Sequence, residues 1–202
     1  MVSTGIWHWD FSRLKHFNLI ERGIDIVPLS LALQRNEHLW SQDARRTTFE
    51  GTSHAATNDI WVRYNDPKKS EDLKELSNEH YPIWLPPYYS LPQIRPIVYG
   101  LMSRLSAAHL GGVLITRIPS GGSVKPHSDM GSWHAEFYQT KIYIPIQSNP
   151  DCVNYAGEEG DEESVRMAPG DAWFMNNLVM HRVENGGLDA RITLIVCLRL
   201  ED

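Results

Sequence analysis

The sequence predicts a mainly β protein with flanking helices, whose C-terminal half forms a sandwich or jelly roll. Between residues 113 and 199, seven apolar segments of strand length alternate with turn residues, a spacing typical of such folds. Helical patterns precede them. The 202 residues are 42% hydrophobic and 22% charged, as is ordinary for a globular protein. We expect one domain over residues 1–202, with a helical and strand elaboration at 1–110 and a jelly-roll core at 111–202.

The N-terminal elements are weakly specified. Residues 1–27 mix aromatic and charged side chains without a clean period, and we expect only an opening strand and a short helix there. A proline is harmless at the start of a helix, so Pro28 and the leucines after it predict a helix over 28–42. The polar residues 43–58 predict a loop, and the apolar run at 60–64 predicts a strand.

The middle of the chain is punctuated by prolines. Ser70, followed by two acidic residues, predicts the N-cap of a short helix to about Ser77. Four prolines over 81–92 exclude regular structure and indicate an ordered loop or lid. The clearest helical stripe begins at Pro92 and is stopped by Gly111-Gly112. The strands expected after it cover 113–118, 124–129, 141–146, 164–168, 172–175, 179–184 and 190–199.

Charge and composition exclude several classes of protein. The net charge is −6 and the basic pairs are scattered, which argues against a nucleic-acid partner because phosphate binding requires clustered cations. The two cysteines are too few for a disulfide framework and have no zinc-site spacing. No apolar run approaches the ~20 residues of a membrane span, and the start lacks a signal-peptide pattern. We expect a cytoplasmic protein that does not bind a membrane.

Three residues have the pattern of a metal site. Residues i and i+2 of a strand project to the same face, so His127 and Asp129 can converge on one point. His181, in an alternating apolar segment, supplies a third ligand. Two imidazoles and one carboxylate form the facial triad that suits Fe(II). A lone histidine in a strand is more often structural, and it is the combination that favours a metal.

An arginine follows the last of these residues at the start of an apolar strand. Arg191 lies ten residues beyond His181 and opens the segment 192–196. A guanidinium in such a strand requires an anion, and a dicarboxylate bound to the metal would supply one.

These segments resemble the Fe(II)/2-oxoglutarate-dependent oxygenases, and within them the aspartyl/asparaginyl β-hydroxylase-like branch found in bacteria and phages. The resemblance covers most of the C-terminal half of the chain. The order HxD, H, R is fairly specific, whereas each piece alone is not. The resemblance implies a double-stranded β-helix, a jelly roll of the cupin kind, whose inner faces hold the site. The matching segments are 117–122, 127–131, 141–146 and 167–173, with His181 and Arg191.

The resemblance also implies cofactors and a reaction. Fe(II) would be held by His127, Asp129 and His181, and the distal carboxylate of 2-oxoglutarate by Arg191. The expected activity is that of a dioxygenase that hydroxylates an unactivated C–H bond and releases succinate and CO2. Asp129 separates this chain from the named mammalian aspartyl β-hydroxylases, which lack a carboxylate there, and from halogenases. A complete triad favours hydroxylation and leaves the substrate open among amino acids, peptides, proteins and other small molecules.

Further co-substrate contacts follow from the same resemblance. Lys141 and Tyr143 share one face of a strand and align loosely with basic and polar residues that contact the co-substrate in the family. Family members more often carry arginine and histidine there, so this chain departs from the pattern. Thr193 lies on the face of Arg191 and either assists in binding the anion or packs.

The substrate side of the site is less marked in the sequence. Arg63 could pair with a substrate carboxylate, while Trp133 and His134 either line the entrance or anchor a surface loop. Asn176-Asn177 is read as a turn, with support of His181 as the alternative. The acidic residues 158–163 predict a hairpin loop. The histidines without companions at ligand spacing, His54, His80 and His109, are read as structural.

Two other classes of protein remain compatible with this pattern. A cupin-like metalloenzyme that does not use 2-oxoglutarate could share the barrel and the triad, but would have no need for Arg191. A non-catalytic jelly-roll binding module would need neither.

Overall fold

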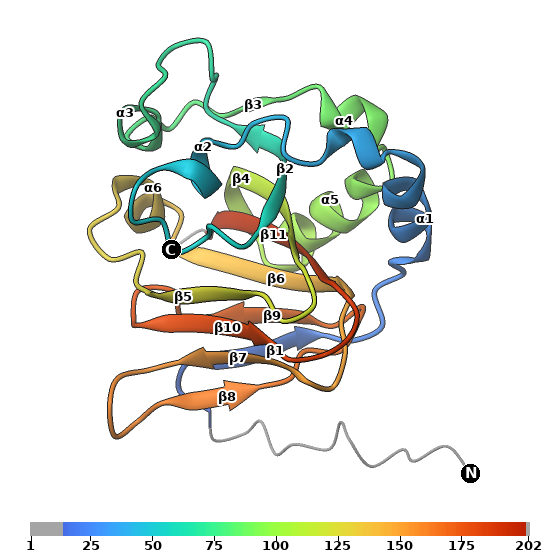
Figure 1. The fold of residues 1–202 in the computed structure, drawn as a ribbon. Coiled ribbons are helices and arrows are strands. Elements are labelled where there is room, and N and C mark those ends of the chain that lie inside the picture. Colours follow the sequence, from blue (N-terminus) through green and yellow to red (C-terminus); the bar gives the residue numbers. More distant parts are fainter. Residues whose placement is uncertain (1–13, 201–202) are drawn as a thin grey trace.

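Two antiparallel sheets form the body of the protein in the computed structural model, which describes residues 14–200. The larger sheet has the strand order β1-β9-β6-β11-β4-β2-β3, and the smaller one β5-β10-β7-β8 (Figure 1). The predicted mainly β fold with a jelly-roll core is confirmed. The strands are β1 (Phe17–Glu21), β2 (Asn58–Tyr64), β3 (Ile83–Trp84), β4 (Ala107–Ile118), β5 (Ser123–His127), β6 (Thr140–Gln147), β7 (Cys152–Ala156), β8 (Glu163–Val165), β9 (Ala172–Met175), β10 (His181–Asn185) and β11 (Arg191–Leu200).

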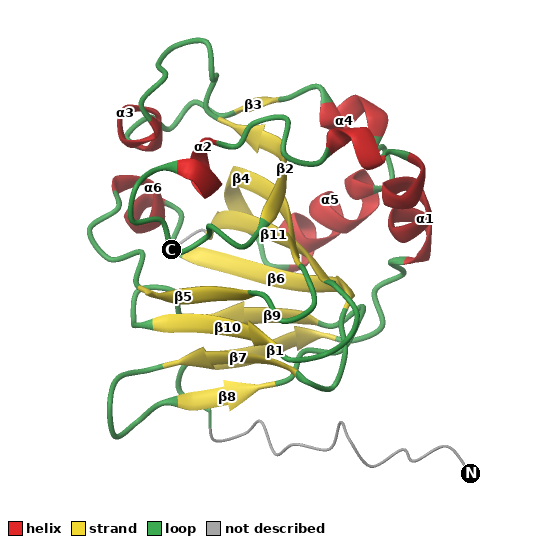
Figure 2. Cartoon of the chain, in the orientation of Figure 1, coloured by secondary structure: helices red, strands yellow, loops and turns green. Residues whose placement is uncertain are grey.

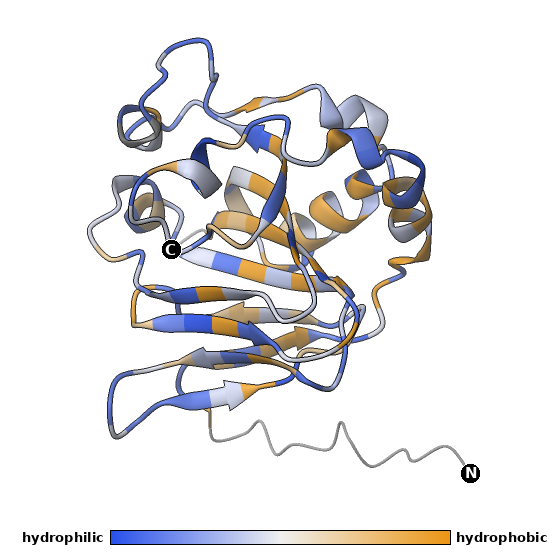
Figure 3. Cartoon of the chain, in the orientation of Figure 1, coloured by the Kyte–Doolittle hydropathy of each residue, from blue (hydrophilic) through white to orange (hydrophobic). Residues whose placement is uncertain are grey.

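Helices α1 (Val27–Arg35) and α5 (Ile94–Arg104) cover the face of the larger sheet that points away from the smaller sheet (Figure 2). Their buried residues pack on alternate residues of the strands, and Figure 3 shows the apolar residues of α1, α5 and β6. The other residues of these strands face the space between the sheets. The helices are α1 (Val27–Arg35), η2 (Glu37–Leu39), α2 (Arg45–Thr48), α3 (Leu73–Ser77), α4 (Pro87–Ser90), α5 (Ile94–Arg104) and α6 (Trp133–Phe137).

Strand β11 shows how this alternation positions the site. Leu194, Val196 and Leu198 are fully buried in the core under the helices. With a period of two, the residues between them point to the opposite face, toward the smaller sheet. That face carries Arg191 and Thr193, so the fold places polar residues in the interior between the two sheets.

The helix predicted over 28–42 is too long. Helix α1 ends at Arg35, where the Asn36 side-chain amide donates to the carbonyl of Ala32 at 2.8 Å, and η2 follows as a single 3-10 turn. Asparagine competes with the helix for backbone groups in this way. The polar loop predicted over 43–58 contains the short helix α2, and the strand predicted at 60–64 is confirmed as part of β2.

The prediction that no regular element occurs over 81–92 was wrong. This segment contains β3 and the one-turn helix α4. Pro86 and Pro87 stand at the first positions of α4, where an amide hydrogen has no partner within the helix and is not required. The predicted helix that ends near Ser77 is confirmed as α3, but it begins at Leu73, so Ser70 is not its N-cap; the Ser70 hydroxyl accepts a hydrogen bond from the backbone amide of Asp72 before the helix.

The helix expected to run from Pro92 to the glycine pair ends earlier. Helix α5 stops at Arg104, Ser106 has a positive φ of 50°, and β4 begins at the next residue. Gly111 and Gly112 therefore lie inside a strand. A Cβ on Gly111 would stand 2.7 Å from the ring of Tyr138, so this glycine permits a close approach and does not end a helix.

The remaining strand predictions differ mainly at their ends. Strand β5 stops at His127, β8 stops at Val165, and β10 starts only at His181. Strand β7 was missed, because it is buried on nearly every residue and has no polar alternation. The opening strand is confirmed as β1; the short helix expected with it is not present at 14–26, and residues 1–13 lie outside the described part.

The smaller expectations agree with the structure. The acidic residues 158–162 are exposed in the loop between β7 and β8. Cys152 and Cys197 are both free thiols. Within residues 14–200, no helix is long and apolar enough to cross a lipid bilayer.

Substitution of Gly111 tests the close packing between β4 and Tyr138. Gly111→Ala should lower the free energy of unfolding by about 1–3 kcal/mol, since the added methyl group overpacks against the aromatic ring. Gly112→Ala is the matched control, because its Cβ would meet no atom closer than 3.7 Å. Urea denaturation of both variants measures the difference, and equal stabilities would contradict the packing described.

Candidate functional site

Two histidines from neighbouring strands face each other at one end of the smaller sheet. His127 is the last residue of β5 and His181 is the first of β10, and the two are direct partners in the strand register. Their ring centroids are 4.2 Å apart. Asp129 lies just beyond the end of β5, and one potential ligand atom from each of the three residues lies within 4.8 Å of the others. The structure thus brings together the three residues that the sequence predicted as ligands.

The hydrogen bonds of the two histidines fix which nitrogen faces the shared centre. Nδ1 of His127 lies 2.8 Å from the carbonyl of Lys125, and Nδ1 of His181 lies 3.0 Å from that of Val179. A carbonyl only accepts, so Nδ1 carries the proton and Nε2 keeps a free lone pair. Burial lowers the pKa of His181 to about 4 and also lowers that of His127. Both rings are therefore neutral near pH 7, as metal binding requires.

Asp129 is held by side chains from outside its own strand. Its Oδ2 accepts hydrogen bonds from Lys141 Nζ and from Asn177 Nδ2, each at 2.7 Å, which leaves Oδ1 available. The amide of Asp129 also donates to the carbonyl of Asn177 at 2.9 Å. Burial alone would raise the pKa of this carboxyl, but Lys141 and His181 outweigh it, so the pKa falls below its usual range. Asp129 is ionised.

These contacts bear on three expectations. The convergence of His127 and Asp129 does not come from strand geometry, because Asp129 lies in the loop after β5. The turn expected at Asn176-Asn177 is confirmed, and the side chain of Asn177 supports Asp129 where the alternative had it support His181. Lys141 binds the carboxylate of the triad, and its predicted contact with the co-substrate stays a prediction. A salt bridge that connects positions 129 and 141 across a loop leaves no signature in the sequence.

Arg191 is buried between the sheets with its charge unpaired. The residue is 2% exposed, and no acidic residue of the described chain forms an ion pair with it. Its Nε has no hydrogen-bond partner, and Nη2 reaches only the sulfur of Met167 at 3.9 Å. Burial lowers the pKa of this guanidinium from a very high value, so it stays charged. Such a group requires an anion.

Two threonine hydroxyls beside this arginine also lack partners. Thr193, on the face of Arg191, pairs in register with Thr116 on β4. The two residues are 0% and 5% exposed, and neither Oγ1 has a partner within the described residues. Buried polar groups are normally satisfied, so these three donors on one sheet face are suited to bind a carboxylate. Thr116 was missed because the pairing of β4 with β11 cannot be read from spacing.

Tyr143 lies between Lys141 and the arginine end of the sheet. It is buried on the inner face of β6, opposite Ile195 of β11. Burial raises its pKa to about 12, so the phenol remains a neutral hydrogen-bond donor. Side chains of Lys141, Tyr143 and Thr193 thus follow one another along the interior from the triad toward Arg191.

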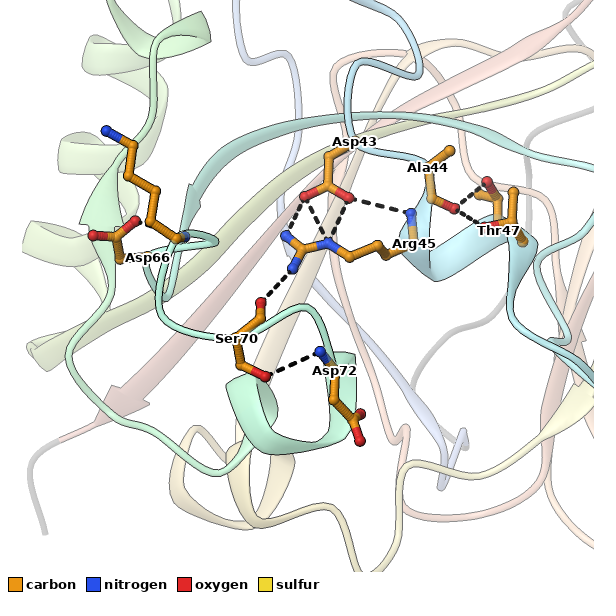
Figure 4. A network of polar contacts seen from close by, with 9 residues as sticks. Asp43, Ala44, Arg45, Thr47, Asp66, Ser70 and Asp72 are labelled. Carbon is orange, nitrogen blue, oxygen red and sulfur yellow. Dashed lines mark hydrogen bonds and ion pairs between the residues drawn. The ribbon is translucent and has the colours of Figure 1, made fainter.

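A cavity of about 680 Å³ opens onto His127 and Asp129. This volume is typical of sites for small ligands or single side chains, which span ~300–1,000 Å³. Its wall combines aromatic side chains, among them Trp61, Tyr64 and Tyr138, with charged and polar ones. At its rim, Arg45 binds the carboxylate of Asp43 and the carbonyl of Ser70, and so ties α2 to the segment before α3 (Figure 4).

Of the three residues expected to contact the substrate, one lines this cavity and two lie outside it. His134 lines it, with its pKa lowered to about 4 by burial. Trp133 is 56% exposed and contacts the ring of His80 outside the cavity. Arg63 also lies outside: its guanidinium stands over the ring of Trp84, 5.0 Å from the centroid, and 3.4 Å from the carbonyl of Leu110.

His54, to which the sequence assigns a structural role, lies beside the candidate ligand His127. His54 lines the cavity and its ring meets that of His127 edge-on, with centroids 4.8 Å apart. Ser53 Oγ lies 2.9 Å from its Nδ1, and the carbonyl of Ser53 accepts the amide of Lys125 on β5. The loop after α2 is thereby fastened to the strand of His127. His54 has no companion at ligand spacing, so only the folded chain shows its position.

The family of the protein follows from a match to a family model. The model for aspartyl/asparaginyl beta-hydroxylases matches residues 88–199, more than half of the chain and including the whole triad and Arg191. The protein belongs to this family. The resemblance noted in the sequence is confirmed. No curated protein matches the sequence of this β-hydroxylase family member significantly.

Solved structures share the fold at low sequence identity. An oxidoreductase of the 2OG-Fe(II) oxygenase family from Burkholderia pseudomallei is 11% identical, with 72% of this chain and 67% of that chain covered and a TM-score of 0.53. The viral collagen prolyl hydroxylase of Paramecium Bursaria Chlorella virus-1, solved with 2OG, is 6% identical, with 93% and 97% covered and a TM-score of 0.52. At these identities the likeness concerns the fold alone.

Removal of one histidine tests the candidate metal site. His181→Ala should weaken Mn(II) binding by about 100-fold or more, because loss of a mere supporting partner already costs 10–100-fold. Isothermal titration of Mn(II) measures the change. His38→Ala removes an exposed imidazole from η2 and should leave the affinity unaltered. Equal affinity of His181→Ala and His38→Ala would exclude His181 as a ligand.

Proposed function

We propose that this β-hydroxylase family member is an Fe(II)- and 2-oxoglutarate-dependent dioxygenase. It would hydroxylate an unactivated C–H bond of an amino-acid, peptide or protein substrate. The single observation that carries the proposal is the pairing of a His-Asp-His triad, open to a cavity, with a buried arginine that has no carboxylate partner.

The triad fits Fe(II) by its donor set and by the state of its atoms. Nε2 of His127, Nε2 of His181 and Oδ1 of Asp129 are free of hydrogen bonds within the described chain. Two neutral imidazoles and one carboxylate on one side of a metal leave positions for other ligands. Bound Fe(II) and 2-oxoglutarate would supply the oxidation, in which O2 gives one oxygen atom to the substrate and one to succinate, with release of CO2.

The polar groups between the sheets fit the co-substrate. Arg191 would pair with the distal carboxylate of 2-oxoglutarate, and the hydroxyls of Thr193 and Thr116 would donate to the same group. Tyr143 would bind between this end and the metal, where its neutral phenol can donate. These side chains orient the co-substrate, and their burial excludes water from it. Substrate would enter from the cavity, past His54 and His134.

The rival classes account for fewer of these features. A cupin-like metalloenzyme without 2-oxoglutarate gives no reason for Arg191, Thr193 and Thr116 to be buried together unsatisfied. A binding module without catalysis gives none for the two histidine tautomers and the ionised aspartate around one centre. Arg63 is not assigned to the substrate, because it lies outside the cavity.

The co-substrate proposal is tested by the binding of 2-oxoglutarate to Mn(II)-loaded protein. Arg191→Leu should weaken this binding by about 10- to 150-fold, the equivalent of hydrogen bonds to a charged group. Thr116→Val, which removes one hydroxyl at constant shape, should weaken it less. Mn(II) affinity should remain unaltered in both variants.

Arg35→Leu, at an exposed position of α1, is the control for loss of an arginine. A 2-oxoglutarate affinity of Arg191→Leu equal to that of the Arg35→Leu control would contradict the proposed co-substrate site. Thermal unfolding of each variant verifies that it is folded at the temperature of the titration.

A further inference from the structure

The outer oxygen of the triad carboxylate accepts one charged and one neutral donor. Lys141 Nζ and Asn177 Nδ2 both lie 2.7 Å from Oδ2 of Asp129. Lys141 belongs to β6 of the larger sheet, and Asn177 lies in the loop that leads into β10. As hydrogen-bond donors the two side chains are equivalent, but only Lys141 brings a charge.

The charge of Lys141 cancels that of the triad. Asp129 is the carboxylate of the triad, and each histidine directs its Nδ1 hydrogen to a backbone carbonyl and keeps Nε2 for the centre, so the three residues bring one negative charge to a metal. Lys141 places one positive charge in contact with it. The two arginines that line the cavity are themselves paired, Arg46 with the buried Asp59 at 2.8 Å and Arg45 with Asp43. A divalent ion bound here would meet ligands with little net negative charge.

A site whose side chains carry no net charge binds a metal ion less tightly than an anionic site does. The positive charge of the bound metal is then not cancelled by the protein, and it can attract an anion. The ion is the largest local charge in such a site, and repulsion between two cations grows in a poorly solvated interior. A chelating dianion removes this repulsion, because it supplies the negative charge that Lys141 has cancelled. Likewise, the dianion binds more tightly when the metal is present, because the charge of the metal attracts it.

We propose that Lys141 couples metal binding to co-substrate binding: by neutralising Asp129 it keeps the site a weak binder of the metal alone and a strong binder of the metal with 2-oxoglutarate. This inference rests on the proposed function, which supplies the dianion. Because the coupling of two ligands is reciprocal, the metal strengthens 2-oxoglutarate binding by the same factor. Lys141 acts through Asp129 and is a positioning residue.

The test compares two variants that remove the two donors of Asp129 in turn. The dissociation constant of Mn(II) is measured by isothermal titration, with and without saturating 2-oxoglutarate, and the ratio gives the coupling. Wild type should show a ratio of about 10 or more, within the usual range of coupling between ligands. In Lys141→Met, Mn(II) alone should bind as tightly as in wild type or more tightly, and the ratio should fall severalfold.

Asn177→Leu is the matched control, since it removes an equivalent hydrogen bond without a change of charge. It should weaken Mn(II) binding equally with and without 2-oxoglutarate and preserve the ratio. Lys141→Arg, which retains the charge, should preserve the ratio as well. Circular dichroism and thermal unfolding ensure that the variants are folded.

The outcomes separate the inference from the function on which it rests. If Lys141→Met loses Mn(II) affinity to the same extent in both conditions, as Asn177→Leu does, Lys141 only orients Asp129 and the coupling is refuted. A wild-type ratio that Lys141→Met retains in full refutes it as well. If wild-type protein binds Mn(II) but 2-oxoglutarate neither binds nor alters that affinity, the proposed function fails and the coupling with it.

Discussion

The contact that links the two sheets at the site is the bond between Lys141 and Asp129. Strand β5 ends at His127, so the backbone alone does not direct Asp129 toward the two histidines. A lysine of the larger sheet and an asparagine of the loop before β10 hold it there, each at 2.7 Å from the same oxygen. The triad is therefore a product of both sheets, and it forms only when they pack together.

The alternation of the larger sheet provides the rest of the interior. Its strands place apolar residues under the helices and send polar residues to the opposite face, so that Thr193 and Arg191 are buried without neighbours to satisfy them. A buried unpaired guanidinium is costly in free energy, and so is a buried free hydroxyl. Their concentration on adjacent strands is the strongest structural sign that a carboxylate belongs between the sheets.

The sequence predicted those features that depend on short spacing. The strands around Ile142 and Leu194 alternate clearly, and His127, Asp129, His181 and Arg191 all lie within the segment that the family model matches. Strand β7 escaped prediction because nearly all its residues are buried, and the end of α5 was misplaced because a glycine pair that usually stops helices serves here to admit Tyr138. His54, Thr116 and Asn177 reach the site through contacts between distant segments, which no local pattern records.

The most direct test of the proposed activity is the release of succinate from 2-oxoglutarate by the purified wild-type protein, with Fe(II) and air and without added substrate. Enzymes of this type consume the co-substrate slowly in this way, so succinate should accumulate in step with the 2-oxoglutarate consumed, and omission of Fe(II) should stop it. Absence of both succinate and 2-oxoglutarate binding in protein shown to contain iron would contradict the account.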